Sequence, residues 1–131
     1  MARLPLSGIR VIDISHVIAG PMATFYLAQL GAEVIKIEPP VGGDVMRAGN
    51  RAESKGHEGP APGFVALNAG KRSVALDFRE PAGRAALLEL ARTCDVFVEN
   101  FRPGVMARHG LDRAAGSAIK PDIVYCSISG F

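Results

Sequence analysis

Short apolar runs that alternate with helical segments constrain the fold of this chain more than any other feature. The first run, residues 9–14, is rich in β-branched side chains and lies between Gly8 and Ser15, as is typical of a buried strand. The predicted strands are residues 9–14, 33–38, 73–77, 95–99 and 122–128. The predicted helices begin at or near Pro21, Phe64, Pro81, Pro103 and Asp112, with Pro21 expected at the first helical position.

This alternation predicts an α/β fold, a Rossmann-like parallel sheet with helices on both faces. We expect residues 1–131 to form a single unit of this kind, because 131 residues is a usual domain length. Repeated Gly and Pro in residues 41–63 predict a long flexible loop. This loop is either a flap over a site, a segment ordered by another chain, or a plain surface insertion.

Composition excludes several classes of protein. The net charge of +2 argues against a strongly basic nucleic-acid binder. No apolar stretch approaches the ~18 residues of a membrane span, and residues 1–6 lack the apolar core of a secretory signal. Cys94 and Cys126 lack the spacing of a metal site or a disulfide framework. We therefore expect a cytoplasmic protein with no metal and with neither nucleic acid nor membrane as partner.

Parallel sheets of this type bind ligands outside the carboxyl ends of their strands, so the residues after each strand are candidates. Residues 15–21, after the first strand, lack the GxGxxG pattern of dinucleotide-binding proteins. Ala19 and Gly20 still permit a phosphate to approach the N-terminus of the next helix. His16 is a candidate phosphate donor or base. The alternative is that His16 only caps or orients the loop.

Basic residues flank the third predicted strand. Arg79 follows it, on the expected ligand side. Lys71 and Arg72 precede it, and such a pair more often forms a solvated edge than a binding site.

An amide, an aromatic ring and an arginine follow the fourth strand. Asn100 and Phe101 could hydrogen-bond and stack on a planar ring, and Arg108 could hold a phosphate with both ends of its guanidinium. Residues 71–131 carry nine basic and seven acidic residues, against six and six in residues 1–70. The sequence therefore predicts a nucleotide-like, polyphosphorylated ligand, with Val17, Leu76 and Phe101 as a possible apolar wall for an adenine.

An ordered set of motifs spans nearly the whole chain. The motifs are residues 6–13, 19–21, 30–38, 42–44, 68–77, 95–103 (DVFVENFRP) and 125–131 (YCSISGF). Together they resemble the class III CoA-transferases, the CaiB/BaiF family, which includes formyl-CoA transferase, carnitine CoA-transferase and α-methylacyl-CoA racemase. The resemblance implies that this is the N-terminal part of the family fold, that CoA binds to it as a substrate, and that the full-length chains form interlocked homodimers.

The resemblance also places the contacts to CoA. Lys71 and Arg72 join the set as candidates chosen on charge. The candidate CoA-binding residues are His16, Val17, Ile18, Ala19, Lys71, Arg72, Leu76, Asp77, Phe78, Arg79, Asn100, Phe101, Arg102 and Arg108. Some family members carry an Arg where this chain has Pro39, so Arg47 or Lys71 is a candidate replacement for that phosphate contact.

The implied activity is transfer of CoA from an acyl-CoA to a small carboxylic acid. An Asp carboxylate attacks the acyl-CoA and forms a mixed anhydride, then an enzyme–CoA thioester. The family pattern places that Asp beyond Phe131, so we assign no catalytic residue and expect residues 1–131 alone to be inactive. The alternatives are a 2-methylacyl-CoA racemase of the same superfamily, or a non-catalytic module that binds CoA or is purely structural.

Overall fold

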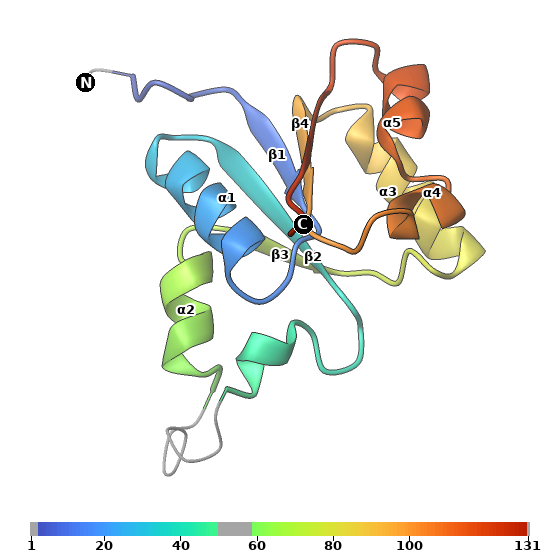
Figure 1. The fold of residues 1–131 in the computed structure, drawn as a ribbon. Coiled ribbons are helices and arrows are strands. Elements are labelled where there is room, and N and C mark those ends of the chain that lie inside the picture. Colours follow the sequence, from blue (N-terminus) through green and yellow to red (C-terminus); the bar gives the residue numbers. More distant parts are fainter. Residues whose placement is uncertain (1–2, 50–58, 131) are drawn as a thin grey trace.

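The computed structural model describes residues 3–49 and 59–130, which are built around a five-stranded parallel sheet (Figure 1). The strands are β1 (Arg10–Asp13), β2 (Glu33–Glu38), β3 (Arg72–Ala75), β4 (Val96–Glu99) and β5 (Val124–Ser127), in the spatial order β3-β2-β1-β4-β5. All four strand pairings are parallel. The predicted α/β fold is confirmed. The strand β2 has the predicted bounds and β4 ends at the predicted residue, whereas β1, β3 and β5 end earlier than predicted.

Helices cover both faces of the sheet, as predicted. Figure 1 shows α1 and α2 on one face and α3, α4 and α5 on the other. The helices are α1 (Ala19–Gln29), α2 (Pro62–Asn68), α3 (Pro81–Ala91), α4 (Val105–Arg108) and α5 (Arg113–Ile119), and a 3₁₀ helix η1 (Val45–Arg47) follows β2.

Proline and aspartate set several helix starts. Pro81 is the first residue of α3, as predicted, and the Asp112 side chain caps α5 by accepting the Ala115 N–H at 3.1 Å. The expectation for Pro21 is wrong by two positions, because α1 begins at Ala19. Proline is tolerated there too, since the first-turn N–H groups of a helix have no intrahelical partner.

The predicted flexible loop at residues 41–63 is only partly described. It contains η1 and the first residues of α2, so these parts of it are regular. Residues 50–58 lie outside the described residues. The three alternatives for this loop, a flap, a segment ordered by another chain and a plain surface insertion, therefore stay open.

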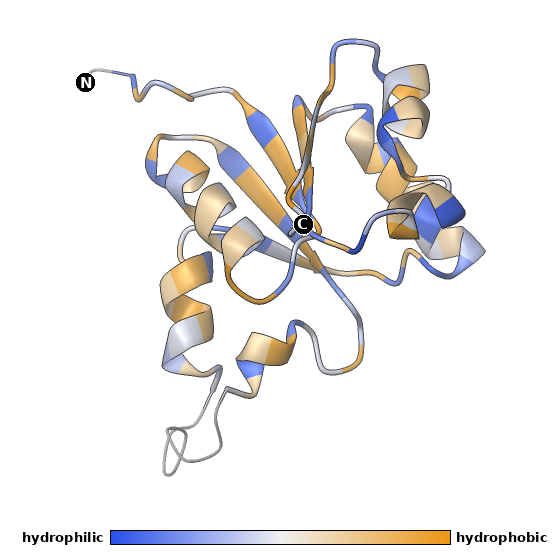
Figure 2. Cartoon of the chain, viewed as in Figure 1, coloured by the Kyte–Doolittle hydropathy of each residue, from blue (hydrophilic) through white to orange (hydrophobic). Residues whose placement is uncertain are grey.

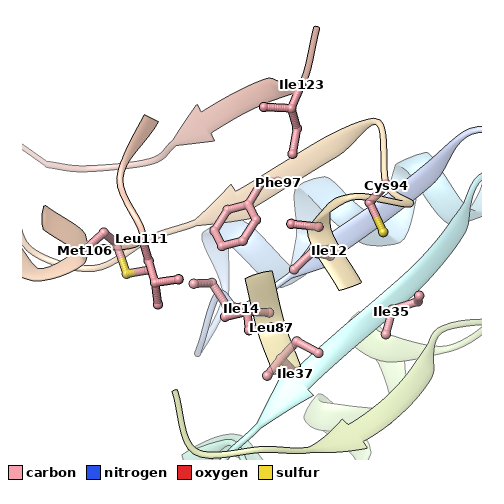
Figure 3. Packing of buried hydrophobic residues seen from close by; sticks show 11 residues of the cluster. Ile12, Ile14, Ile35, Ile37, Leu87, Cys94, Phe97, Met106, Leu111 and Ile123 are labelled. Atoms are coloured by element: carbon pink, nitrogen blue, oxygen red, sulfur yellow. The ribbon is translucent and has the colours of Figure 1, made fainter. Parts of the chain in front are cut away.

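The main core lies between the sheet and α3, where alternate strand residues meet the helix (Figure 3). Its buried members are Ile12, Ile14, Ile35, Ile37, Leu87, Ala91, Cys94, Phe97, Met106, Leu111 and Ile123. A smaller cluster on the α1 face holds Val11, Ala32, Val34 and Val98. Figure 2 shows hydrophilic residues beside hydrophobic ones along β1 and β2. On β2, however, the polar Lys36 and Glu38 are buried too.

The two edge strands are less covered than the predicted sheet. All four residues of β3 are exposed, and Val124 on β5 is 59% exposed. The three central strands alone carry the near-continuous buried pattern of a doubly covered parallel sheet.

Candidate functional site

The chain reverses its direction of travel across the sheet between β1 and β4. From β1 it moves outward through β2 to β3, then returns to build β4 and β5 on the other side of β1. The segment after β1 leads to α1 on one face, and the segment after β4 leads to α4 on the opposite face. The two segments diverge at the carboxyl edge of the sheet, and this switch point is the crevice in which such folds usually bind ligands.

Asn100 joins the two sides of this crevice. Its Oδ1 accepts the backbone N–H of His16 at 2.8 Å, and its Nδ2 donates to the backbone carbonyl of His16, also at 2.8 Å. The side chain therefore ties the segment after β4 to the segment after β1, 84 residues away in sequence. Asn100 is held in a structural role, and its amide fixes the position of the predicted phosphate loop.

Aromatic rings form a continuous row beside this junction. The His16 ring packs edge-to-face on Phe101 at 5.4 Å between centroids, and Phe101 packs on Phe78 at 5.6 Å. Phe78 in turn packs on His109 at 5.4 Å. The segment between β3 and α3 thus brings Phe78 to the crevice, although β3 lies two strands away from β1. The residues predicted after three different strands therefore meet, and Phe101 and Phe78 form an apolar wall.

The N-terminus of α1 faces the same edge. Gly20 is buried so close to Ser15 that a Cβ at this position would lie 2.2 Å from the Ser15 Cβ. Only glycine permits β1 and α1 to meet so tightly. Ile18 and Val17, just before the helix, are exposed to 51% and 43%, and Ala19 is exposed as well. These four predicted residues, His16 to Ala19, form one accessible stretch ahead of the helix.

Buried charges lie beneath this stretch, on the α1 face of the sheet. Asp13 is fully buried, and its carboxylate accepts hydrogen bonds from Ser15 and from the Thr24 hydroxyl. Burial opposes its ionisation, but Lys36 and Lys71 outweigh that effect and lower the pKa of Asp13 below its ordinary value. Lys36 is itself buried and donates to the Ser15 carbonyl at 2.8 Å.

Glu38, at the end of β2, is the anchor of the following segment. It accepts hydrogen bonds from Arg47 Nη2 at 2.7 Å, from the Ser73 hydroxyl at 2.8 Å and from the Asp44 N–H at 3.1 Å. Burial opposes its ionisation, yet these donors lower the pKa of Glu38 to about 2. Arg47, a candidate replacement for the phosphate contact at Pro39, is therefore engaged by Glu38.

The geometry does not favour Lys71 as a phosphate ligand. Its ammonium is buried and reaches Asp13 at 2.9 Å, the Pro21 carbonyl at 2.8 Å, Thr24 at 2.7 Å and Asn68 at 2.9 Å. An ammonium has three N–H groups, so these four acceptors occupy all of them. Lys71 is not part of a solvated edge either. It is a cation that joins β1, α1 and α2.

Two other basic candidates are paired on the surface. Arg72 is an exposed residue that pairs with Glu33, at the amino end of β2 and away from the crevice. Arg79 binds Asp77 with two N–H groups, at 2.8 and 2.6 Å, and these bonds lower the pKa of Asp77 to about 2. Arg79 would have to release Asp77 before it could bind a phosphate.

Arg102 and Arg108 are the basic candidates whose side chains remain available. Both are exposed, and neither guanidinium has a hydrogen-bond or ion-pair partner among residues 3–49 and 59–130. Arg102 directly follows Phe101, and Arg108 ends α4 beside His109. Leu76, in contrast, is partly buried against the main core and contributes little accessible wall.

Two hollows among the described residues lie away from the aromatic row. A hollow of about 250 Å³ lies between α2 and the β2–β3 edge, lined by Phe64, Asn68 and the Glu38–Arg47 pair among others. A second, of about 480 Å³, lies beyond that pair, along Pro39, Pro40, Gly42 and Gly43. Neither hollow is lined by the residues of the crevice.

Sequence reasoning missed three residues of this region. His109 completes the aromatic row, and Lys36 and Asp44 lie directly under the His16 turn. The signal for Lys36 was a lysine inside an otherwise buried strand pattern. The signal for Asp44 was an acidic residue directly after two glycines. For His109 the sequence offered no signal.

Comparison with known proteins agrees over almost the whole chain. Residues 6–131 match CoA-transferase family III. The chain is 45% identical to the succinate–glutarate CoA-transferase of Agrobacterium fabrum, over 97% of this chain and 32% of that protein. It is 42% identical to the human succinyl-CoA:glutarate CoA-transferase, over 97% of this chain and 28% of that protein.

Solved structures agree in fold. The crystal structure of a CaiB/BaiF family protein from Brucella suis superimposes with a TM-score of 0.90 and 40% identity, over 99% of this chain and 34% of that one. The chain thus spans about a third of the length of the curated relatives and structures that it matches. Within the described residues, no helix is long and apolar enough to cross a membrane.

Proposed function

This chain belongs to CoA-transferase family III, and from that premise we propose that it is the CoA-binding part of an enzyme that transfers CoA from an acyl-CoA to a carboxylic acid. The observation that carries the proposal is the junction made by Asn100 at the switch point of the sheet. It holds the N-terminus of α1, the Phe101 ring and the arginines after β4 around one crevice. A helix N-terminus suits a phosphate, a ring suits a base, and free arginines suit further phosphates.

CoA offers these groups in one molecule. Its pyrophosphate would lie at the start of α1, where the first N–H groups of the helix lack helical partners. The N–H groups of His16 and Val17 would not bind it, because they already donate to Asn100 and Asp44. Its adenine would pack on the exposed parts of Phe101 and Val17. Its 3′-phosphate would take the guanidinium of Arg108, with Arg102 beside it.

The two aspartates beneath the crevice are poorly placed to act as the nucleophile. The Asp13 carboxylate is buried and bound to Lys71, and that of Asp44 is buried and 3.1 Å from Lys36. A carboxylate held in this way is neither accessible to a thioester nor free to attack it. From the family pattern, we propose that the attacking carboxylate comes from outside residues 1–131.

The wider setting is proposed on the same family premise. The substrates would be a CoA thioester and a small carboxylic acid, and the assembly an interlocked homodimer in the cytoplasm. Relatives at 40–45% identity are named for succinate, glutarate, oxalate and malate, which are small dicarboxylic acids. The racemase alternative lacks an observation in this chain that favours it.

The proposal is tested by calorimetric titration of the chain with CoA and with dephospho-CoA. Wild-type protein should bind CoA, and Arg108→Ala should weaken CoA by about tenfold, because a charge-assisted contact to phosphate contributes roughly 1.5–3 kcal/mol. The same variant should change dephospho-CoA binding much less. Arg92→Ala is the control, since Arg92 lies at the opposite edge of the sheet and pairs with Glu89.

Absence of heat at millimolar CoA would overturn the CoA site. Equal losses for CoA and dephospho-CoA in Arg108→Ala would overturn the placement of the 3′-phosphate and leave the site itself standing.

A further inference from the structure

Asp44 lies directly under the turn that starts the proposed CoA site. Its side chain is fully buried, and Oδ1 accepts the N–H of Val17 at 3.4 Å and that of Met46 at 3.0 Å. Oδ2 lies 3.1 Å from the Lys36 ammonium and 3.8 Å from Nδ1 of His16. Among the described residues, however, no group is oriented to donate a hydrogen bond to Oδ2. The charge of Oδ2 is therefore balanced by the Lys36 ammonium and not by an aligned hydrogen bond, and a buried ion pair of this kind depends on both partners staying in place.

The segment that carries Asp44 is held firmly in place. Its own N–H donates to Glu38, which also binds Arg47, the last residue of η1, and Ser73 of β3. The guanidinium of Arg47 packs over the Phe64 ring at 4.1 Å, which joins the segment to α2. Asp44 is therefore a fixed point, and the turn above it is the part that must adapt.

The turn is strained. Val17 has a φ of +70°, and it is the one residue other than glycine with a positive φ in the described part of the chain. A β-branched residue in this region is an outlier that costs about 1–3 kcal/mol. Two anchors act on the turn from opposite sides: the Asn100 amide holds the His16 backbone, and Asp44 accepts from the next N–H.

We propose that Asp44 is a positioning residue for CoA: its buried carboxylate, balanced by Lys36, holds the His16–Val17 turn in the strained conformation that presents the N-terminus of α1 to phosphate. The inference rests on the proposed CoA site and deepens it. Asp44 itself does not touch the ligand, because its side chain is fully buried.

The position demands acceptors on both sides of the side chain. Two backbone N–H groups face Oδ1, and an ammonium faces Oδ2. Asparagine offers one oxygen and one NH₂ group, so Asp44→Asn sets donor against donor on one side, whichever way the amide turns. If Lys36 is replaced by Met as well, the NH₂ group can face the apolar side chain and the oxygen can again accept from the turn. The double variant should therefore restore what the single variant loses.

The test compares wild-type chain with Asp44→Asn, Lys36→Met and the double variant. Asp112→Asn is the matched control, because Asp112 also caps a helix but caps α5 and not the η1 segment beneath the turn. CoA affinity is measured by calorimetry, and the amide signals of Val17 and the imidazole titration of His16 are followed by NMR. The NMR readouts require no ligand.

Asp44→Asn should weaken CoA binding by about tenfold, the scale of losing a charge-assisted contact, and should move the Val17 amide signal. The double variant should return to within about threefold of wild type, and Asp112→Asn should change neither readout.

The pKa of the His16 imidazole should shift in opposite directions when the charge of Asp44 or that of Lys36 is removed. Burial lowers its pKa, Asp44 raises it, Lys36 lowers it, and Asp13 and Glu38 raise it. The His16 pKa should therefore fall in Asp44→Asn and rise in Lys36→Met. A purely structural loss of packing would not produce opposite shifts.

Wild-type affinity in Asp44→Asn with an unmoved Val17 signal would overturn the inference, as would a double variant that is no better than the single one. If Asp44→Asn fails to fold, the CoA affinity and the Val17 amide signal of the double variant decide whether the inference holds. If wild-type chain does not bind CoA, the proposed function fails, and the Val17 and His16 signals still decide whether Asp44 positions the turn.

Discussion

The two faces of the sheet are built from alternate residues of the same strands, yet they differ in chemistry. On the α3 face, Ile12 of β1, Ile14 directly after it, and Ile35 and Ile37 of β2 form an apolar core. On the α1 face, the same strands contribute Asp13, Lys36 and Glu38, all at most 3% exposed.

The difference shows which part of this chain depends on exact distances between side chains. Apolar packing tolerates small shifts, whereas buried charges are stable only when each meets its partners at hydrogen-bond distance. The charged residues gather at the carboxyl ends of β1 and β2, directly below the proposed CoA site, while the amino ends on that face carry the apolar Val11 and Val34. The α3 face therefore contributes mainly to the stability of the fold. The carboxyl half of the α1 face fixes the position of the residues at the proposed CoA site.

The largest expected effect is on the charged face. Lys71→Met should destabilise the chain by about 3–5 kcal/mol, because it leaves the Asp13 carboxylate buried without its nearest cation. The neighbouring substitution Arg72→Met removes an exposed ion pair with Glu33 and should cost no more than about 1 kcal/mol. Denaturant unfolding of both variants provides the measurement. Equal, small losses would show that the buried cation is dispensable and that the contrast between the faces is wrong.

Truncation on the apolar face should follow closely in size. Leu87 of α3 is fully buried in the main core (Figure 3). Leu87→Ala should lose about 3 kcal/mol, from lost burial and the cavity left behind. The proposed CoA crevice should keep its shape, so CoA affinity of the folded fraction should stay at the wild-type value. A large drop in that affinity would mean that the two faces are coupled.

Acid should act on the charged face. The pKa of Glu38 falls from 4.5 to about 2 on folding, so the stability it contributes is full above pH ~4.5 and is lost as the pH falls towards 2. Glu38→Gln should remove this part of the acid sensitivity, on the order of 2 kcal/mol. Unfolding midpoints at pH 7 and pH 3 test it. Glu89→Gln, in an exposed pair with Arg92, should keep the wild-type pH dependence.

Alkali should act on the apolar face. Burial raises the pKa of Tyr125, whose ring stacks on Phe97 and whose hydroxyl donates to the Leu111 carbonyl. Its contribution is therefore complete below pH ~10 and is lost as the pH rises towards the folded pKa. Tyr125→Phe should lose about 1 kcal/mol at neutral pH and should remove that alkaline loss. Tyr26→Phe is the exposed control, and an alkaline profile unchanged by Tyr125→Phe would contradict the assignment.

The smallest expected effect is a gain. Val17→Gly removes the strain at φ +70° and should raise stability by about 1 kcal/mol, while CoA binding weakens because the turn loses its wall and its rigidity. Val41→Gly, at an exposed residue with ordinary backbone, should instead lose a few tenths to about 1 kcal/mol. Thermal unfolding and CoA titration check both. A destabilised Val17→Gly would show that the turn is not strained.

The sequence predicted the fold more completely than it predicted the site. Apolar runs and proline positions predicted five strands, and all five lie in one parallel sheet. The residues chosen at strand ends do converge in part, since His16, Asn100, Phe101 and Phe78 share contacts. Whether they bind CoA stays a prediction. Lys71 could not be assigned from sequence, because the partners that bury its charge lie 3, 47, 50 and 58 residues away.

By itself, the sequence determined the order of elements, because strand and helix periodicities are local. It also identified the family, because an ordered set of motifs can be recognised without knowledge of any contact. Only the tertiary structure decided which charges are buried and paired and which are free for a ligand. In the sequence, nothing distinguishes three charged residues that lie outside the predicted strands, namely Lys71, Arg108 and Asp44. The distances across the sheet make the first a buried cation, leave the second exposed, and place the third beneath a strained turn.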